Sequence, residues 1–313
     1  MATSTSDYAN LSGNFTGEKA SGYLYPAILA ANTIGNGIVT THENVKYKLN
    51  IRNMATTGYL ANGTCDFTPS GNLSLSDVVL EVKELQVNTE LCKKTFRTQW
   101  ESLEMRGAIT GQEIPASFQE FFIQKNLELI AKDFEVAIWQ GTAGAGFEGL
   151  QAKLAANTEV IDIAAIGGGL NAANIIAELG KVYAAIPDEV FVAEDVKIII
   201  PISAAKFYQE ALSAVGEGYT GGTGAGYLTQ SVVGAKPLNY QGIDLVVANG
   251  LGANKMVAAR SSDLHFGTNV LTDLAELRVI DMSETDGSDN VRFVARMTGG
   301  TQVTNGSNIV YYS

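Results

Sequence analysis

The chain has 313 residues, of which 46% are hydrophobic and 17% charged, and 33 acidic against 21 basic residues give it a net charge of −12. This length suits one large or two smaller domains with an ample core, and the shortage of charge indicates that copies of the chain or another protein cover part of its surface. The acidic balance without a basic stripe argues against a dedicated nucleic-acid-binding protein. The sequence also shows no long apolar run and no signal-peptide pattern. We therefore expect a protein that is made and used in a cytoplasm, or one that leaves it by a route other than secretion.

The first part of the chain changes character near residue 41. Residues 1–40 are polar and then small and apolar with little periodicity, so we expect an arm that is ordered by contacts with something else. VKYKLNIRNM alternates apolar and polar residues, which predicts a strand with one buried face made of Val45, Tyr47, Leu49 and Ile51. After a turn-rich stretch, VVLEVKELQVN predicts a second strand. Because a two-stranded excursion is marginally stable alone, we expect it to lie on another surface.

Two helices are predicted next. FRTQWESLEM, residues 96–105, is short and amphipathic, and the segment from Pro115 to Gln140 is long and opens with a capping-box spacing. The long helix carries two apolar stripes, so we expect it to be sandwiched between layers and to end at Gly141. The first stripe is Ile123, Leu127, Ile130, Phe134, Ala137 and Ile138; the second is Phe118, Phe122, Leu129 and Val136; the polar face is Gln124, Glu128, Lys132 and Glu135.

Residues 150 to 260 alternate helix and strand patterns, which predicts a compact α/β unit. The predicted elements are a helix from Asn171 to Ile186 with Asn171 as its cap, the strand KIIIPI, a helix from Pro201 to Val215, the strand GIDLVVAN and the segment KMVAARSSDLHFG. The segment ELRVIDMSETDGSDNVRFVARMTGG then predicts two long strands on either side of Asp286-Gly287, a dipeptide typical of β-hairpin turns. The acidic stretch from Asp281 to Asn290 lacks the spacing of a calcium loop, so turn chemistry explains it better.

The pattern G-x-G-x-x-G occurs twice, at Gly144, Gly146 and Gly149 and again at Gly216, Gly218 and Gly221. A dinucleotide site needs a strand before the first glycine and a helix after the third. Here a predicted helix precedes each copy, and no G-K-[ST] follows. The pattern therefore favours loops between elements over nucleotide binding.

Histidine and cysteine are too few for most metal chemistry. The two cysteines and two histidines form no C-x-x-C and no H-x-x-x-H, so no zinc site is expected. Cys65 and Cys92 are expected to be free thiols in a reducing cytoplasm. Cys92 precedes Lys93-Lys94, but no histidine is near it in sequence, so a catalytic role is not expected. His42 and His265 are expected at the surface or in packing, and Glu189 and Asp195 in solvent.

The order of these elements resembles the HK97-like major capsid proteins of tailed bacteriophages, over nearly the whole chain. Four phrases carry the resemblance in order: IPASF opening the long helix, IWQG closing it, FEGL after the glycines, and KMVAARSSDLHFGTNVLTDLAELRVID near the end. The resemblance implies an α+β fold of five parts. These are an N-terminal arm (1–40), an E-loop-like β excursion (41–95), a first P-domain part with the spine helix (96–145), an A-domain (146–264) and a second P-domain part with long strands (265–313). A return of the last strand to the A-domain is left open as an alternative.

The resemblance also implies a function: a non-enzymatic shell protein, without cofactor or metal, that self-assembles into the icosahedral head around double-stranded DNA. Its expected partners are copies of itself in pentamers and hexamers, a portal protein, a separate scaffolding protein and decoration proteins, with no membrane and no sequence-specific DNA contact. It would be located in the virion after assembly in the host bacterial cytoplasm. No long charged coiled coil precedes the arm, so no internal scaffolding domain is expected, and no cross-link is expected at Lys46 or Lys83.

The expected assembly sites are two loops. Gly141 to Gly149 would form the crossover from the spine helix to the A-domain, and a second glycine-rich loop would line the five-fold and six-fold axes. The candidate residues are Gly216, Gly218, Tyr219, Gly221, Gly224 and Gly226 in that second loop, and Tyr59 and Leu60 in the β excursion. Two alternatives remain: an encapsulin-type bacterial nanocompartment, which the long arm argues against, and an NAD(P)-binding oxidoreductase that uses the glycine loops.

Overall fold

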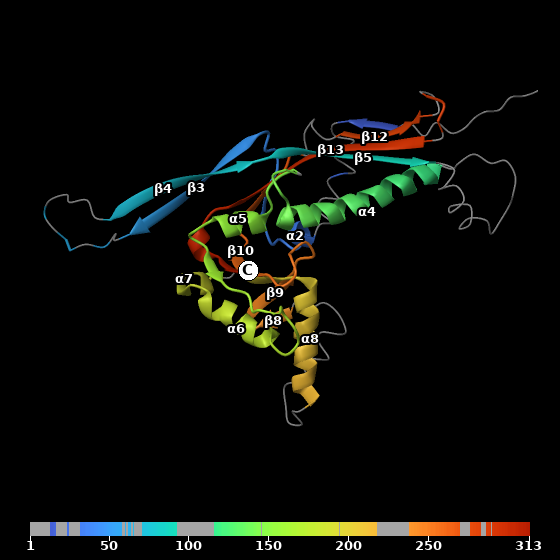
Figure 1. The fold of residues 1–313 in the computed structure, drawn as a ribbon. Helices are drawn as coiled ribbons and strands as arrows, with labels where there is room; N and C mark the ends of the chain where they lie inside the picture. The colour runs from blue at the N-terminus through green and yellow to red at the C-terminus, as the bar shows by residue number, and fades with distance from the viewer. Residues whose placement is uncertain are drawn as a thin grey trace, which may run out of the picture.

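The computed structural model describes residues 13–16, 24, 32–57, 60, 62–63, 65, 71–92, 116–144, 146–193, 195–217, 238–269, 276–282, 286–288 and 290–313. These residues form two six-stranded sheets, a separate two-stranded ribbon and several helices (Figure 1). The helix predicted at residues 96–105 lies outside the described residues.

The first sheet is the centre of the predicted α/β unit. Its strand order is β6 (Ile161–Ile163), β14 (Val310–Tyr312), β10 (Met256–Arg260), β7 (Val196–Ile200), β9 (Ile243–Val247) and β8 (Leu238–Tyr240). β7 and β9 are parallel and are joined through α8 (Ile202–Glu217), while the last strand of the chain, β14, returns to this sheet between β6 and β10. α6 (Ile175–Ala185), followed by the short α7 (Asp188–Phe191), packs against α8 and β10.

Strand alternation divides the residues of this sheet between two hydrophobic cores. In β7, Ile198 and Ile200 join the core with α6 and α8, whereas Ile199 joins a larger core on the other face of the sheet. β10 does the same, with Ala258 on one side and Val257 on the other. Because both faces are covered, these strands are almost entirely buried, which explains their continuous apolar sequences.

The predicted cap of α6 is wrong by one turn. Asn171 lies before the helix, where its Oδ1 accepts hydrogen bonds from the backbone N–H groups of Ala173 and Asn174 at 2.9 and 3.1 Å. These bonds form a turn, so the helix begins only at Ile175.

The second sheet contains the predicted terminal hairpin. Its order is β1 (Gly13–Thr16), β12 (Glu276–Asp281), β13 (Asn290–Val303), β11 (Leu264–Gly267) and β2 (Thr40–His42), and β5 (Lys83–Cys92) also pairs with β13. The first ten residues of β13 pair with β5 and the last four with β11. The hairpin prediction is confirmed: β12 and β13 are antiparallel, Gly287 has a φ of +74°, and Asp286 Oδ1 accepts a hydrogen bond from the N–H of Ser288.

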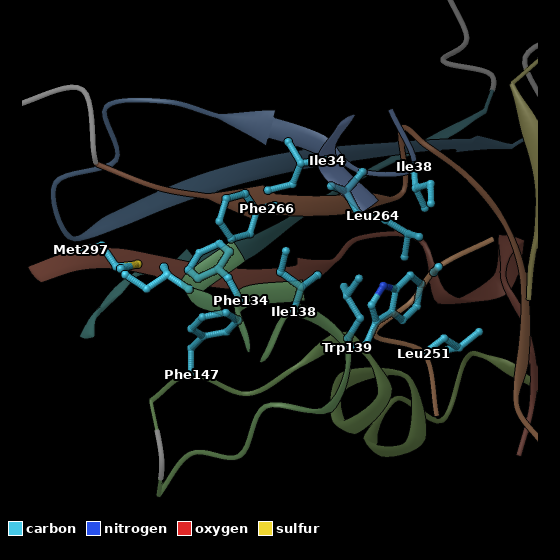
Figure 2. Close-up of a cluster of buried hydrophobic side chains, with 14 of the residues drawn as sticks. Ile34, Ile38, Phe134, Ile138, Trp139, Phe147, Leu251, Leu264, Phe266 and Met297 are labelled. Carbon is cyan, nitrogen blue, oxygen red and sulfur yellow. The ribbon is translucent and has the colours of Figure 1, made fainter. Parts of the chain in front are cut away.

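The long helix α4 (Ala116–Gln140) lies along this second sheet (Figure 1). Its first predicted stripe is buried at Ile123, Ile130, Phe134 and Ile138, as expected. In the core, Phe134 lies between Phe266 and Phe147, with ring centroids 5.6 and 6.1 Å apart in edge-to-face geometry (Figure 2).

The prediction that α4 is sandwiched between layers is wrong for the rest of its circumference. In the second stripe, Leu129 and Val136 are 54% and 40% exposed; the side chains of Phe118 and Phe122 lie outside the described part. Glu135, predicted on the polar face, is buried. The sheet covers one side of the helix only, whereas a segment remote in sequence covers Glu135. Helical periodicity cannot predict such a contact.

The predicted β excursion is a two-stranded ribbon of β3 (Lys48–Thr57) and β4 (Asn72–Glu81), which extends away from the body of the molecule (Figure 1). The second predicted strand, VVLEVKELQVN, is two strands, because the chain leaves the ribbon at Val82 and continues as β5 in the second sheet. Val82 is buried at this junction, and its N–H donates to the carbonyl of Tyr47 at 3.0 Å. The predicted buried face is also partly wrong: Val45 is buried but Tyr47, which precedes β3, is exposed.

Candidate assembly surfaces

The root of the ribbon is fixed to the body by buried and polar contacts. Leu80 is fully buried. The side-chain amide of Gln302 donates to the carbonyl of Val79 at 2.7 Å, and Asn53 Nδ2 donates to Asn305 Oδ1. A Cβ added at Gly300 would lie 2.2 Å from the carbonyl oxygen of Glu81, so glycine permits this close approach of β13 to the ribbon.

The ribbon also presents an exposed face of charged and apolar pairs. Directly paired residues share a face, which places Lys48 with Glu81, Arg52 with Asp77, and Met54 with Leu75. The first two pairs are ion pairs of 3.3 and 3.5 Å. Met54 and Leu75 are 61% and 66% exposed, and Leu60, a predicted site residue, is fully exposed between the strands. Tyr59 lies outside the described residues. This cross-strand pair leaves most of both apolar side chains in solvent.

A second uncovered surface is a groove beside α4, with a volume of about 300 Å³. Asp133, Val136, Ala137 and Gln140 form one wall at helical spacing, and Leu85 of β5 lies opposite. Within the described residues β5 pairs with β13 alone, and its Leu85 lines this groove.

The α/β unit exposes apolar residues on two separate sides. Phe191 and Val192 lie exposed at the end of α7, Ile176 is exposed in α6, and Ile202 is exposed at the start of α8. α7 and α8 lie on opposite sides of the unit (Figure 1).

The second glycine motif begins inside a helix. α8 extends to Glu217, two residues beyond the predicted end, so Gly216 is helical and not the first residue of a loop. Glycine can adopt helical φ and ψ at a cost of about 1 kcal/mol relative to alanine, which adjacent helical residues offset. The other candidates in this segment, Gly218, Tyr219, Gly221, Gly224 and Gly226, lie outside the described residues.

The first glycine motif follows α4, as predicted, and therefore lacks the strand of a dinucleotide site. Its loop is closed by a hydrogen bond from the N–H of Gly149 to the carbonyl of Gly141 at 2.8 Å, before α5 (Leu150–Ala156). A Cβ would lie 2.4 Å from the Ala137 oxygen at Gly141, and 2.5 Å from the Trp139 oxygen at Gly149. Close backbone packing, rather than a special φ, requires these two glycines; only Gly146 has a positive φ, of +145°.

Glu135 connects three parts of the chain through a buried hydrogen-bond network. Its carboxylate accepts from the N–H and the hydroxyl of Thr33, in the short helix α2 (Asn32–Gly35), at 3.0 and 2.5 Å. It also accepts from the N–H of Gly250 at 3.3 Å, and Trp139 Nε1 donates to the Thr33 hydroxyl at 2.6 Å. Because every group is satisfied, the network holds the N-terminal segment and the α/β unit against α4. The sequence offered no signal for this role, since the partners lie 102 and 115 residues away.

The two histidines are partners of each other. His42 Nε2 and His265 Nδ1 lie 3.0 Å apart, and His265 is buried, so the packing prediction is confirmed for His265. Burial and the charge of His42 lower the pKa of His265 to about 4, and burial also lowers the pKa of His42. Nearby, burial raises the pKa of Asp263, although Asn305 and Arg260 donate hydrogen bonds to its carboxylate at 2.9 and 3.2 Å.

The described residues were also compared with the requirements of a disulfide, a metal site and a membrane-spanning helix. Cys65 and Cys92 are both free thiols. No group of three or more His, Cys, Asp or Glu residues is placed to hold a metal ion in the described ranges. None of the helices described is long and apolar enough to cross a membrane.

Comparison with known proteins gives a result at the level of structure only. No protein-family model and no curated protein sequence matches the chain. The procapsid of satellite phage P4 with its size-determination protein matches 92% of this chain and 96% of its own, at 11% identity and a TM-score of 0.57. A structure of Mycobacterium phage Cain matches 88% of each chain at 12% identity and a TM-score of 0.55.

The chain has the HK97-like capsid fold. A virus-like particle from Pyrococcus furiosus also matches, over 95% of this chain and 99% of its own, at 12% identity and a TM-score of 0.51. The HK97-like fold thus accounts for the long helix α4, the projecting ribbon and the separate α/β sheet. At identities of 11–12%, the likeness concerns the path of the backbone and not individual side chains.

Proposed function

We propose that this chain is the major capsid protein of a tailed phage. Copies of it self-assemble as pentamers and hexamers into an icosahedral head shell around double-stranded DNA. The fold supports the proposal, because the matched P4 structure is a procapsid and the matched chains are covered almost completely. In this reading α4 is the spine helix of the P-domain, the ribbon is the E-loop and the α/β unit is the A-domain.

The ribbon is the observation that carries the proposal. It is a pair of ten-residue strands with little core of its own, yet it presents Met54 and Leu75 to solvent. An isolated two-stranded ribbon is marginal in water. A second copy that covers this face would stabilise the ribbon and bury both side chains, and the groove beside α4 is an apolar surface available on the neighbouring subunit.

Repetition explains how modest contacts would suffice. Each copy would use the ribbon, the groove beside α4 and the two sides of the α/β unit, so that every subunit is held at several interfaces. Weak contacts made simultaneously within a closed assembly sum to a stable shell. The net charge of −12 suits a container for DNA, because an acidic wall does not bind the phosphate backbone tightly.

The proposal extends to location and partners. The protein would be assembled in the host bacterial cytoplasm and be part of the virion, with a portal protein, a separate scaffolding protein and decoration proteins as partners. Domain boundaries near residues 40, 95, 145 and 264 belong to the same proposal, with β14 as a strand that returns to the A-domain.

An encapsulin-type nanocompartment is the alternative, because one matched shell is a virus-like particle from a cellular organism and not a named phage. The particle from Pyrococcus furiosus matches almost its entire length to this chain. The two functions differ in the contents of the shell, DNA for a phage head and enzyme cargo for a nanocompartment. The third reading, an oxidoreductase, has no such support, because a helix precedes both glycine motifs.

Electron microscopy of the purified chain tests the proposal. We expect closed shells or capsomer rings when the chain is expressed alone or with a scaffolding protein. Nucleic acid inside shells recovered from an infected host would support the phage head, and a co-purified enzyme would support the nanocompartment. A monomer at all concentrations that binds nicotinamide cofactors would overturn both shell functions.

A further inference from the structure

Four Asn-Gly pairs occur in the sequence, at residues 36–37, 62–63, 249–250 and 305–306. In such a pair the backbone nitrogen of the glycine can attack the side-chain carbonyl carbon of the asparagine, because glycine has no Cβ to obstruct it. The attack forms a C–N bond, releases the side-chain nitrogen as ammonia and leaves a cyclic succinimide. Water then opens the ring to aspartate or isoaspartate. Water is the only co-reactant, so local structure decides which pair reacts.

The pair at 36–37 is held by its backbone. The N–H of Gly37, which would have to attack, donates to the carbonyl of Ile34 at 3.0 Å. Lys197 Nζ lies 3.4 Å from the carbonyl oxygen of Asn36 and 2.9 Å from that of Gly37. Rotation of this peptide unit toward the asparagine side chain would break these contacts.

The pairs at 249–250 and 305–306 are held by buried contacts. The N–H of Gly250 donates to Glu135 Oε1 at 3.3 Å, and Gly250 is packed against the backbone of α4. Asn305 Nδ2 donates to Asp263 Oδ1 at 2.9 Å, and Gly306 is buried in the short helix η2 (Gly306–Asn308). At 249–250 the hydrogen bond holds the backbone nitrogen that would attack. At 305–306 it holds the side-chain amide that would be attacked.

Asn62 and Gly63 differ from the other three pairs. They lie between β3 and β4, both are exposed, and neither makes a hydrogen bond to another described residue. A Cβ added at Gly63 would meet nothing within 4 Å. Within the described residues, no hydrogen bond or close contact therefore keeps this nitrogen and this amide from the geometry that ring closure needs.

We propose that Asn62 is a site of spontaneous deamidation and that the folded chain protects the other three Asn-Gly pairs. The product adds a carboxylate between the ribbon strands and, in the isoaspartyl form, one extra backbone methylene. The reaction proceeds in the isolated chain and does not depend on the proposed function.

Peptide mapping by mass spectrometry tests the assignment. The purified full-length chain is incubated at mildly alkaline pH, and conversion of each of the four asparagines is followed over time, with an isoaspartate-specific methyltransferase as a second readout. We expect Asn62 to convert several times faster than the other three. In denaturant, where all four pairs lack structure, we expect similar rates.

Gly63→Ala is the matched variant, because the space around Gly63 is open and its φ is not positive, so the fold tolerates a methyl group. The methyl group crowds the attacking nitrogen and should slow conversion at Asn62 by roughly an order of magnitude. Three results would overturn the proposal: equal rates at all four sites in the folded chain, an intact Asn62, or conversion in Gly63→Ala as fast as in the parent chain.

Discussion

His42 and His265, 223 residues apart in the sequence, share a hydrogen bond of 3.0 Å between Nε2 and Nδ1. The bond joins β2 to β11, which pair as short parallel strands. Of the two, β2 lies just before the ribbon in the chain. In this hydrogen bond one nitrogen carries the proton and donates it, and the other must be unprotonated to accept it. The contact therefore requires at least one neutral ring. Protonation of both rings would place two positive charges side by side at a partly buried position.

The first prediction is a loss of stability in weak acid. In the folded state the pKa of His265 is lowered to about 4, from about 6.5 in the unfolded chain. The unfolded chain therefore binds the proton more readily, so the free energy of unfolding is fully retained above pH 6.5 and decreases as the pH falls toward 4. From pH 7 to pH 5 we expect a loss of about 2 kcal/mol in the free energy of unfolding. Asp263, whose raised pKa gives the opposite sign, offsets part of it. Urea unfolding at both pH values measures the change. His265→Gln, which cannot be protonated, should remove most of this pH dependence; an unchanged slope would contradict the assignment.

The second prediction concerns the core of α4. Phe134 is buried against Phe147 and Phe266, so Phe134→Ala should leave a cavity and cost about 3–5 kcal/mol. This is a large share of a typical domain's stability, so we expect insoluble subunits rather than malformed shells. Leu129→Ala, on the exposed side of the same helix, is the control and should cost less than about 1 kcal/mol. A soluble Phe134→Ala chain that unfolds like the parent would show that this side of α4 is not a core.

The third prediction concerns the Glu135 network. Glu135→Ala leaves the backbone N–H groups of Thr33 and Gly250 without their acceptor, at about 1–3 kcal/mol for each buried donor. We expect faster hydrogen exchange in residues 32–39 and in the turn at 248–251, with little change in α6. Glu135→Gln keeps one carbonyl acceptor and should have an intermediate effect. Equal protection in all three chains would mean that the network does not hold these segments.

The fourth prediction tests the ribbon as an assembly element. Met54→Glu places a charge on an exposed side chain, so the monomer should fold with unchanged stability, while shell formation should fall sharply because the carboxylate would be buried against a neighbour. Met54→Leu, which keeps the apolar surface, should assemble normally. Circular dichroism and particle counts in electron micrographs separate folding from assembly. Shells from Met54→Glu at parental yield would place this face outside the interfaces.

The fifth prediction concerns the glycine-rich segment after α8. If Gly218 belongs to a loop that lines the capsomer axes, Gly218→Val should give folded, soluble subunits that form few closed shells or shells of altered size. A phosphate-binding loop would instead lose ligand binding and keep its oligomeric state. Electron microscopy of the variant beside a nucleotide titration distinguishes the two outcomes, and normal shells would count against the axial placement.

Features that depend on neighbours in the chain could be predicted from the residues alone. The buried stripe of α4 follows from apolar residues at helical spacing, as at Ile130 and Phe134, and the hairpin follows from the turn chemistry of Asp286-Gly287. The helix before each glycine motif was readable for the same reason. Three features depend on how distant segments pack: which side of α4 is covered, the departure of the chain from the ribbon at Val82, and the burial of Glu135. Those outcomes depend on segments more than 100 residues away, such as Thr33 beside Glu135, and local periodicity contains no information about which remote surface will cover a residue.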